Sequence, residues 1–343
     1  MSRTELAQLG EFGLIDRISK QFPTQNPETI KGIGDDCAVI DNGTDFYTVI
    51  STDMLVEGIH FDLSYVPLTH LGYKSVVVNV SDVAAMNAVP KQITVAIAVS
   101  NRFSVEAIDT LYEGIRVACE QYKVDLVGGD TTASPSGLVI SVTVIGLVEK
   151  HKIAYRNTAQ ENDIICVSGD LGAAYMGLQV LEREKQVFLS DPQMQPELDG
   201  KEYIVRRQLK PEARMDIIYE LAELDIVPTS MIDISDGLAS ELLHLCTQSG
   251  TGATIFEDKL PIDALTYNTA VDFNLSPITA ALNGGEDYEL LFTIRQNDFE
   301  KLKLHPDIFF IGFMQAREKG VNLLTKQENV YPITAQGWKH FES

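Results

Sequence analysis

Acidic stretches flanked by glycine or hydroxyl residues recur along this chain, and they constrain its fold more than any other feature. One of them, Ser51-Thr52-Asp53, follows the apolar run at 46–50 and sets two hydroxyls beside a carboxylate. The end of a strand is held firmly, while the loop after it is free to meet a ligand. We therefore expect these stretches to stand at strand ends around one site. The other four lie at 32–38, 128–132, 233–238 and 284–289.

Apolar periodicity predicts strands and helices that alternate along the 343 residues, but not in strict β-α-β register. A chain of this length suits two domains, which the mixed pattern predicts to be α/β or α+β in class and which we expect to span 1–149 and 150–343. Strands are expected at 46–50, 92–100, 124–127, 138–148, 164–167 and 290–294. Helices are expected at 11–20, 68–86, 104–122, 173–183, 210–224 and 238–248, with a polar loop at 186–201.

The net charge of −22, from 49 acidic and 27 basic residues, argues against a protein that binds nucleic acid through a basic face. The four cysteines show no Cys-x-x-Cys spacing, which indicates reduced thiols and no zinc site. The first residues lack the layout of a signal peptide, and the apolar runs fall short of the roughly 20 residues that span a bilayer. We expect a soluble, cytoplasmic protein with neither a membrane nor a nucleic-acid partner.

Several carboxylates are candidates for one shared cleft: Asp35, Asp36, Asp53, Asp82, Asp130, Asp233 and Asp236. Two unit charges about 4 Å apart repel by roughly 4 kcal/mol at an effective dielectric near 20, so such a cluster predicts several divalent cations. Hard oxygen ligands suit Mg²⁺, which usually arrives with phosphates. The chain has no P-loop, protein-kinase or dinucleotide-binding motif. A carboxylate scaffold that holds Mg²⁺ can nevertheless support phosphoryl transfer, which needs positioning and charge neutralisation.

Taken singly, these residues have plainer interpretations that stay open at this point. Two Asp residues at 35–36 are common turn formers, and an Asp such as Asp236 at a helix start is ordinarily an N-cap. Asp82 is flanked by valine and alanine residues on its predicted helix, where burial without a partner would be costly. Arg156 is either a solvated loop residue or a phosphate ligand. Trp338 is either a core residue or a surface on which an aromatic ring stacks.

Together the motifs resemble those of the thiamine-monophosphate kinase family, within the ATP-binding superfamily of aminoimidazole ribonucleotide synthetase. The resemblance runs essentially end to end, from Gly10-Glu11-Phe12 to Gly337-Trp338. Each motif alone is weak, but their order is specific. They are Gly-Ile-Gly-Asp-Asp-Cys-Ala at 32–38, Ser-Thr-Asp at 51–53, Asn-x-Ser-Asp at 79–82, Gly-Gly-Asp-Thr-Thr at 128–132, Asp-x-Ser-Asp-Gly-Leu at 233–238 and Gly-Gly-Glu-Asp-Tyr-Glu-Leu at 284–290.

The resemblance implies a two-domain aminoimidazole ribonucleotide synthetase-like fold with the site between the domains. The N-terminal α/β domain would pair its strands with those of a second subunit to form the barrel of a homodimer. ATP would be the co-substrate, several Mg²⁺ ions the cofactor and thiamine phosphate the acceptor. In-line transfer of the ATP γ-phosphoryl group would give thiamine diphosphate and ADP. No strong general base is needed, because the attacking group is already an anionic phosphate.

The resemblance also implies a role for each matching residue. The Mg²⁺ ligands would be Asp36, Ser51, Thr52, Asp53, Asp82, Asp130, Asp233 and Asp236. The ATP contacts would be Gly129, Asp130, Arg156 and Ser235. The contacts to thiamine phosphate would be His60, Glu286 and Trp338.

Two other functions compete with this one. Another enzyme of the superfamily, such as an ATP-dependent cyclo-ligase, would share the metal scaffold. Its selenium branch would have a reactive Cys near the N-terminus, but no Cys precedes Cys37, and its hydrogenase branch would have a C-terminal Cys, but the chain ends in His-Phe-Glu-Ser. His60 and Trp338 favour the thiamine assignment. A non-catalytic acidic protein that buffers Mg²⁺ or Ca²⁺ would bind metal without turning over ATP.

Overall fold

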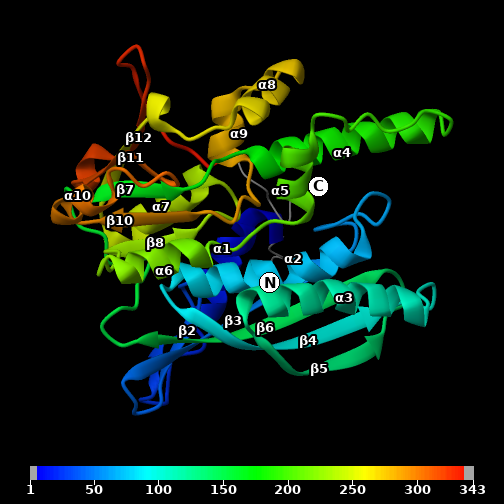
Figure 1. Cartoon of the computed structure of the whole chain (residues 1–343). Helices are drawn as coiled ribbons and strands as arrows, with labels where there is room; N and C mark the ends of the chain where they lie inside the picture. Colours follow the sequence, from blue (N-terminus) through cyan, green and yellow to red (C-terminus); the bar gives the residue numbers. More distant parts are fainter. Residues whose placement is uncertain (1–5, 336–343) are drawn as a thin grey trace.

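Two mixed α/β halves make up the structure, a computed structural model that describes residues 6–335 (Figure 1). Helix α1 (Leu6–Ser19) opens the N-terminal half, residues 6–149, and is interrupted at Gly10, which has a φ of 65°. A six-stranded sheet follows, in the order β1-β2-β3-β6-β4-β5. Its strands are β1 (Thr29–Lys31), β2 (Ala38–Asp41), β3 (Phe46–Val56), β4 (Val89–Val99), β5 (Asp125–Ala133) and β6 (Leu138–Glu149).

Helices α2 (Leu68–Ala85) and α3 (Val105–Tyr122) lie side by side on one face of this sheet (Figure 1). They approach backbone to backbone, because a Cβ atom at Gly72 would stand 2.0 Å from the carbonyl oxygen of Leu111. Helix α2 also contacts β8, α5 and α6 of the C-terminal half, so it is buried along most of its length. It therefore forms the seam at which the two halves meet.

The C-terminal half, residues 150–335, contains a seven-stranded sheet in the order β13-β12-β9-β11-β7-β10-β8. Its strands are β7 (Ile164–Ser168), β8 (Ser230–Asp233), β9 (Gly252–Phe256), β10 (Leu290–Ile294), β11 (Ile308–Gln315), β12 (Val321–Leu324) and β13 (Val330–Pro332). Its helices are α4 (Ala173–Ser190), α5 (Glu202–Leu209), α6 (Met215–Glu223), α7 (Leu238–Ser249), α8 (Ala264–Asp272), α9 (Pro277–Asn283) and α10 (Phe299–Leu302). Two sheets flanked by helices confirm the predicted mixture of α/β and α+β structure.

One apolar core runs through both halves. It includes Val76 and Val80 of α2, Met231 of β8 and Phe292 of β10, none of which has measurable exposure. The site between the halves therefore rests on shared packing. Within residues 6–335, no helix combines the length and apolar character that a membrane crossing requires.

Two acidic stretches lie inside strands, and the prediction that they follow strand ends was wrong. Ser51-Thr52-Asp53 lies in the middle of β3, and 128–132 lies inside β5. The cause is strand pairing, since all eleven residues of β3 have partners in β6. Side chains alternate between the faces of a strand, so Ser51 and Asp53 face α2 while Thr52 lies on the opposite face.

The expected helix at 210–224 was also wrong in part. Helix α5 ends at Leu209, and α6 begins only at Met215. Pro211 explains why no helix includes Lys210, because the residue before a proline is disfavoured in helical conformation. Helix α4 continues to Ser190, so the predicted loop at 186–201 begins later than expected.

Candidate active site

Three carboxylates from distant parts of the chain meet at the seam. Asp36 precedes β2, Asp82 lies in the last turn of α2, and Asp233 is the last residue of β8. One carboxylate oxygen from each lies within 4.8 Å of the others. The convergence that the sequence predicted for these three acids is therefore present.

Burial and mutual repulsion change the titration of this cluster. Burial, followed by the charges of Asp53 and Asp233, raises the pKa of Asp82 well above its usual range. Burial and the nearby Asp36 raise the pKa of Asp233 to about 7. A divalent cation would relieve both effects, because it neutralises the carboxylates and supplies the contacts that water no longer gives. The donor set is made of hard oxygens and fits Mg²⁺.

Hydroxyl and amide groups hold these acids in place. The Ser51 hydroxyl donates to Asp82 at 2.5 Å, and the Ser81 hydroxyl donates to Asp233 at 2.6 Å. The backbone N–H of Asp53 donates to the side-chain oxygen of Asn79 at 3.0 Å. Strand β3 is thereby fastened to α2 at the level of the cluster.

Arg156 is the cation that faces the cluster most directly. Its guanidinium binds both oxygens of Asp36, at 2.9 Å and 2.5 Å. The hydroxyls of Ser230 and Ser249 donate to its carbonyl oxygen at 3.0 Å and 3.1 Å, which fixes its backbone. Burial and the charge of Asp36 raise the pKa of Asp35 to about 6. Arg156 is thus a half-buried, oriented group and not a solvated loop residue.

The loop at 284–289 lies against the segment that follows Asp233. The N–H of Glu286 donates to the carbonyl of Ser235 at 2.6 Å, and the N–H of Tyr288 donates to that of Ile234 at 2.9 Å. The backbone of Asp236 is fixed by α7, since its N–H donates to the buried carboxylate of Glu241 at 2.9 Å. These backbone bonds join the metal end of the site to Glu286.

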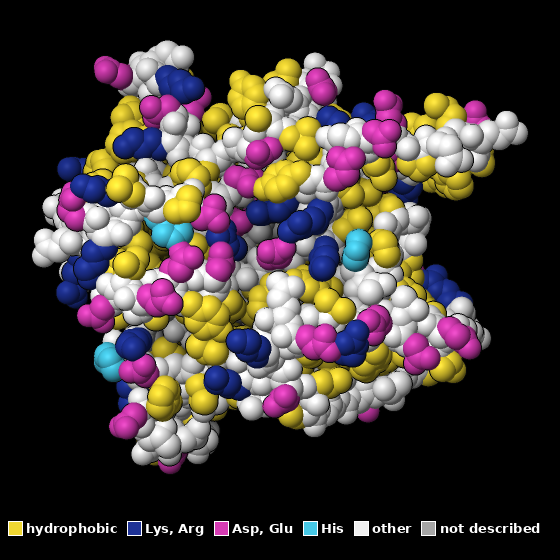
Figure 2. All heavy atoms as spheres, in the orientation of Figure 1, with side chains coloured by type: hydrophobic (Ala, Val, Ile, Leu, Met, Phe, Trp, Pro, Cys, Tyr) yellow, Lys and Arg dark blue, Asp and Glu magenta, His cyan; other side chains and the backbone are white. Residues whose placement is uncertain are grey.

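The side chains of this loop alternate in their contacts. Glu286 pairs with Lys74 of α2, with a distance of 2.9 Å between the ammonium nitrogen and one carboxylate oxygen. Asp287 points the other way and accepts from the N–H of Gly172 at 2.8 Å, at the start of α4. Figure 2 shows lysine and arginine side chains gathered around acidic ones where the two halves meet.

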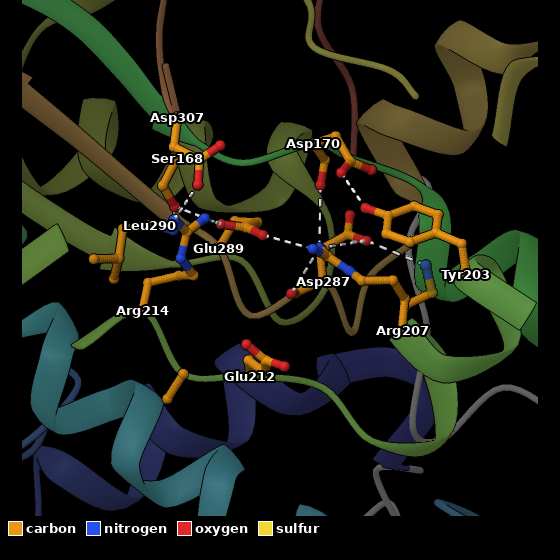
Figure 3. A network of polar contacts seen from close by, with 12 residues as sticks. Ser168, Asp170, Tyr203, Arg207, Glu212, Arg214, Asp287, Glu289, Leu290 and Asp307 are labelled. Carbon is orange, nitrogen blue, oxygen red and sulfur yellow. Dashed lines mark hydrogen bonds and ion pairs between the residues drawn. The ribbon is translucent and has the colours of Figure 1, made fainter. Parts of the chain in front are cut away.

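A buried ionic network supports the loop (Figure 3). Glu289 accepts from Arg207 at 2.8 Å, from Arg214 at 2.5 Å and from the Ser168 hydroxyl at 2.6 Å. Arg207 also donates to the carbonyl oxygen of Asp287 at 3.2 Å. The left-handed backbone of Glu286 and Tyr288, with φ of 57° and 53°, is held between these anchors.

Two predicted metal ligands, Thr52 and Asp130, lie away from the cluster of Asp36, Asp82 and Asp233. The hydroxyl of Thr52 donates to the carbonyl of Val142 at 3.1 Å, on the face of the sheet away from Asp53. Asp130 is exposed on β5, and strands β6 and β4 separate it from β3. At the usual spacing of strands, three steps across the sheet amount to about 14 Å.

A hollow of about 470 Å³ lies beside β5. It is lined by Tyr112 of α3 and by Gly128, Gly129 and Asp130, together with aliphatic side chains. A Cβ atom at Gly129 would stand 1.8 Å from the carbonyl oxygen of Val95, so this strand lies closer to β4 than a side chain allows. Tyr112 was not predicted, although its helix directly precedes the glycine pair.

Of the contacts predicted for thiamine phosphate, His60 lies in the loop that follows β3. The Nδ1 atom of His60 accepts a hydrogen bond from the N–H of Val56 at 3.0 Å. The same loop is tied to α4 by an ion pair of 2.7 Å between Asp62 and Lys185. Trp338 lies outside the described residues.

Comparisons with known proteins agree with this geometry. Residues 34–148 match the family described as AIR synthase related protein, N-terminal domain. A thiamine-monophosphate kinase from Buchnera aphidicola (subspecies Schizaphis graminum) is 36% identical over 97% of this chain and 99% of its own length. One from Bacillus subtilis is 32% identical over 97% of this chain and its whole length. The solved structure of AaThiL complexed with AMPPCP and TMP is 32% identical, with a TM-score of 0.84 over 99% of this chain and 100% of that one.

Proposed function

The chain belongs to the thiamine-monophosphate kinases, and from that membership we propose how its residues divide the reaction. The enzyme transfers a phosphoryl group from ATP to thiamine phosphate, which gives thiamine diphosphate and ADP. The observation that carries the assignment of the site is the convergence of Asp36, Asp82 and Asp233 within 4.8 Å. The transferred group reacts where these acids meet.

Mg²⁺ ions occupy the carboxylate cluster in this proposal. Asp36, Asp82 and Asp233 are the central ligands, and Ser51 and Asp53 stand beside them on β3. Asp236 is the ligand of a further ion at the edge of the cluster. When bound, the metal neutralises the phosphate oxygens and aligns the attacking and leaving groups.

The protein's own groups orient the nucleotide. Arg156 is half-buried and held beside the cluster by Asp36, so its guanidinium would be in place to donate to a phosphate oxygen of the nucleotide. Ser235 is exposed at the turn beside the cluster and can donate its hydroxyl to a phosphate. The hollow beside Gly129 and Tyr112 offers an aromatic wall and bare backbone to the nucleotide base.

The acceptor lies on the other side of the cluster. The Glu286 carboxylate pairs with the positive charge of the thiamine moiety or accepts a hydrogen bond from its ring amino group. His60 contacts the same moiety from the loop after β3. Trp338 stacks on the cationic ring. The acceptor phosphate attacks the γ-phosphorus in line, and the ionised nucleophile makes a general base unnecessary.

A homodimer completes the site. All residues of the edge strand β5 are exposed, including Leu126 and Val127, at 44% and 57% exposure. An edge strand with apolar side chains is a ready surface for a second copy. Asp130 and Thr52 lie on the face of the sheet that is turned away from α2 and α3. We therefore assign them to metal and nucleotide contacts at the interface of two copies.

We propose two further assignments, the domain boundary and the location of the enzyme. The domain boundary lies between residues 149 and 150, because the first sheet ends at Glu149 and the next strand begins at Ile164. The enzyme works in the cytoplasm, where its substrate ATP is made and used.

Incubation of the purified protein with thiamine phosphate and ATP tests the function, with and without MgCl₂. We expect thiamine diphosphate and ADP in equal amounts with Mg²⁺ and none with a chelator, and unphosphorylated thiamine should not serve as an acceptor.

The variant Asp53→Asn should lose at least about a thousandfold in kcat with an unchanged melting temperature, because it removes a metal ligand. Chelator-resistant turnover, or wild-type kcat in Asp53→Asn, would contradict the metal-assisted mechanism.

A further inference from the structure

Lys74 is a buried lysine in the middle of α2, with a side chain that is 5% exposed. Lysine is almost never buried without a partner, because its ammonium group loses its water. Here the ammonium lies 2.9 Å from one carboxylate oxygen of Glu286 and donates to the carbonyl oxygen of Gln208 at 3.2 Å. The lysine thus joins α2, α5 and the loop at 284–289.

Gln208 binds the other oxygen of the same carboxylate. Its amide nitrogen donates to Glu286 at 2.5 Å, while its own amide oxygen is buried and has no hydrogen-bond partner in the described part of the chain. An unpaired buried oxygen is unfavourable. The amide therefore keeps this orientation because of Glu286, and the two oxygens of that carboxylate are each held by a different residue.

Helix α2 sets the distance between this pair and the metal cluster. Lys74 precedes Ser81 and Asp82 by seven and eight residues, which is two turns or about 10–12 Å along one side of the helix. Ser81 binds Asp233, and Asp82 is part of the cluster. The same rigid helix therefore carries the phosphate end of the site and the group that holds Glu286.

We propose that Lys74 and Gln208 are positioning residues that select the acceptor by fixing the Glu286 carboxylate. The inference rests on the proposed function, in which Glu286 contacts the heterocycle of thiamine phosphate. With both oxygens tethered, Glu286 presents one orientation to a ring amino group. The adjacent ammonium also balances its charge, so recognition depends on hydrogen-bond geometry more than on net attraction. The ligand class is a phosphorylated alcohol that carries an amino-substituted heterocycle.

The test is the variant Lys74→Met, which keeps an unbranched apolar side chain as far as the ε position and removes the charged ammonium group. We expect the KM for thiamine phosphate to rise about tenfold or more, with kcat and the KM for ATP within about twofold of wild type. The preference for thiamine phosphate over oxythiamine phosphate, in which a carbonyl replaces the ring amino group, should fall by a similar factor. Lys150→Met is the matched control, because it removes a 2.7 Å ion pair with Asp41 away from the cleft.

A double variant separates positioning from a general structural role. In the background Glu286→Gln, the further change Lys74→Met should leave the KM for thiamine phosphate unchanged within about twofold, since the group that it positions has lost its function. If Lys74→Met raised the KM for thiamine phosphate by the same factor in Glu286→Gln as in the wild type, the proposal would be overturned. An unchanged acceptor preference in Lys74→Met would overturn it as well.

If Lys74→Met does not fold, the variant Gln208→Leu tests the same proposal. This variant removes the second tether and should raise the KM for thiamine phosphate and lower the acceptor preference in the same way. Normal acceptor kinetics in Gln208→Leu would overturn the proposal. Wild-type protein that fails to phosphorylate thiamine phosphate would instead overturn the proposed function itself.

Discussion

Asp82 and Asp233 have environments that suit metal ligands better than structural ion pairs. No cation is within salt-bridge distance of either carboxylate in the described part of the chain, and each accepts a hydrogen bond from a serine hydroxyl. A hydroxyl stabilises the ionised form less than a cation does. The carboxylates are thus arranged to receive positive charge from outside the protein.

This arrangement predicts how stability depends on pH. The folded pKa of Asp233 is about 7, against an ordinary value of 3.8. Between these values the folded protein keeps a proton that the unfolded chain releases, so this group's contribution to the free energy of unfolding falls as pH rises from about 4 to 7. Bound Mg²⁺ should offset the loss, because it stabilises the ionised carboxylates.

Thermal unfolding at about pH 5.5 and about pH 7.5, with and without MgCl₂, checks this expectation. Mg²⁺ should raise the melting temperature more at the higher pH, and Asp233→Asn should abolish most of the Mg²⁺ effect. An equal Mg²⁺ shift at both pH values would show that these acids do not take up the ion.

At the residue scale, the sequence predicted the acids, and it predicted Ser51 and Arg156 as ligands of metal and ATP but not as partners of Asp82 and Asp36. Asp36 and Asp233 stood out because they lie in acidic stretches beside glycine or serine, and Asp82 because burial among apolar neighbours is costly. Lys74 did not stand out, although it shares a helix face with Ser81, and that periodicity could have revealed it. Thr52 was grouped with its neighbours by sequence adjacency, while the alternation of side chains along β3 places it on the other face.

At the element scale, the loop at 284–289 is held by charge and not by apolar packing. Asp287 and Glu289 anchor the loop through Gly172 and Arg214 (Figure 3). Glu286, between them and the metal cluster, pairs instead with Lys74 of α2. Arg214, whose side chain is 9% exposed, binds Glu289. Its loss would leave a buried carboxylate with one cation fewer.

The variant Arg214→Met should lower the free energy of unfolding by about 3 kcal/mol, which is typical when one partner of a buried ion pair is removed. The KM for thiamine phosphate should rise as well, because the loop carries Glu286. Arg116→Met is the control, since its pairs with Glu113 and Glu120 lie on the exposed surface of α3. Arg116→Met should lower the free energy of unfolding, measured by chemical denaturation, by less than about 1 kcal/mol. Equal costs in both variants would contradict a special role for Arg214.

The boundaries of the elements explain where prediction failed at this scale. The apolar run at 46–50 identified the first half of β3, but polar residues continue the strand because β6 pairs with its full length. Such pairing joins residues about ninety positions apart, which a local pattern does not reveal. Pro211, by contrast, was a local signal that α5 ends, and the prediction of a helix at 210–224 gave it too little weight.

At the scale of the whole molecule, the open edge of the first sheet predicts a homodimer. Val127→Lys on β5 should convert the dimer to a monomer in sedimentation velocity, because a buried lysine at a strand pairing is unfavourable. Activity should fall with it, since the site needs Asp130 at the interface. Leu304→Lys, at a residue of the C-terminal half that is 87% exposed, is the control and should remain dimeric. A monomeric wild-type protein with full activity would contradict the proposed assembly.

The arrangement of the two halves followed from the sequence only through the resemblance of its motifs to a known family. Periodicity gave the elements but not the order of strands in either sheet. The position of α2 between the sheets depends on packing over both halves, as the shared core of Val76, Val80 and Phe292 illustrates. Tertiary contacts of this kind have no signature in a short window of sequence.

The most direct test of the account is a crystal structure with Mn²⁺ and a non-hydrolysable ATP analogue, with the metal located by its anomalous scattering. We expect anomalous peaks bound by the carboxylates of Asp36, Asp82 and Asp233 and by the phosphates of the analogue. Peaks bound elsewhere, with these three carboxylates free of metal, would contradict it.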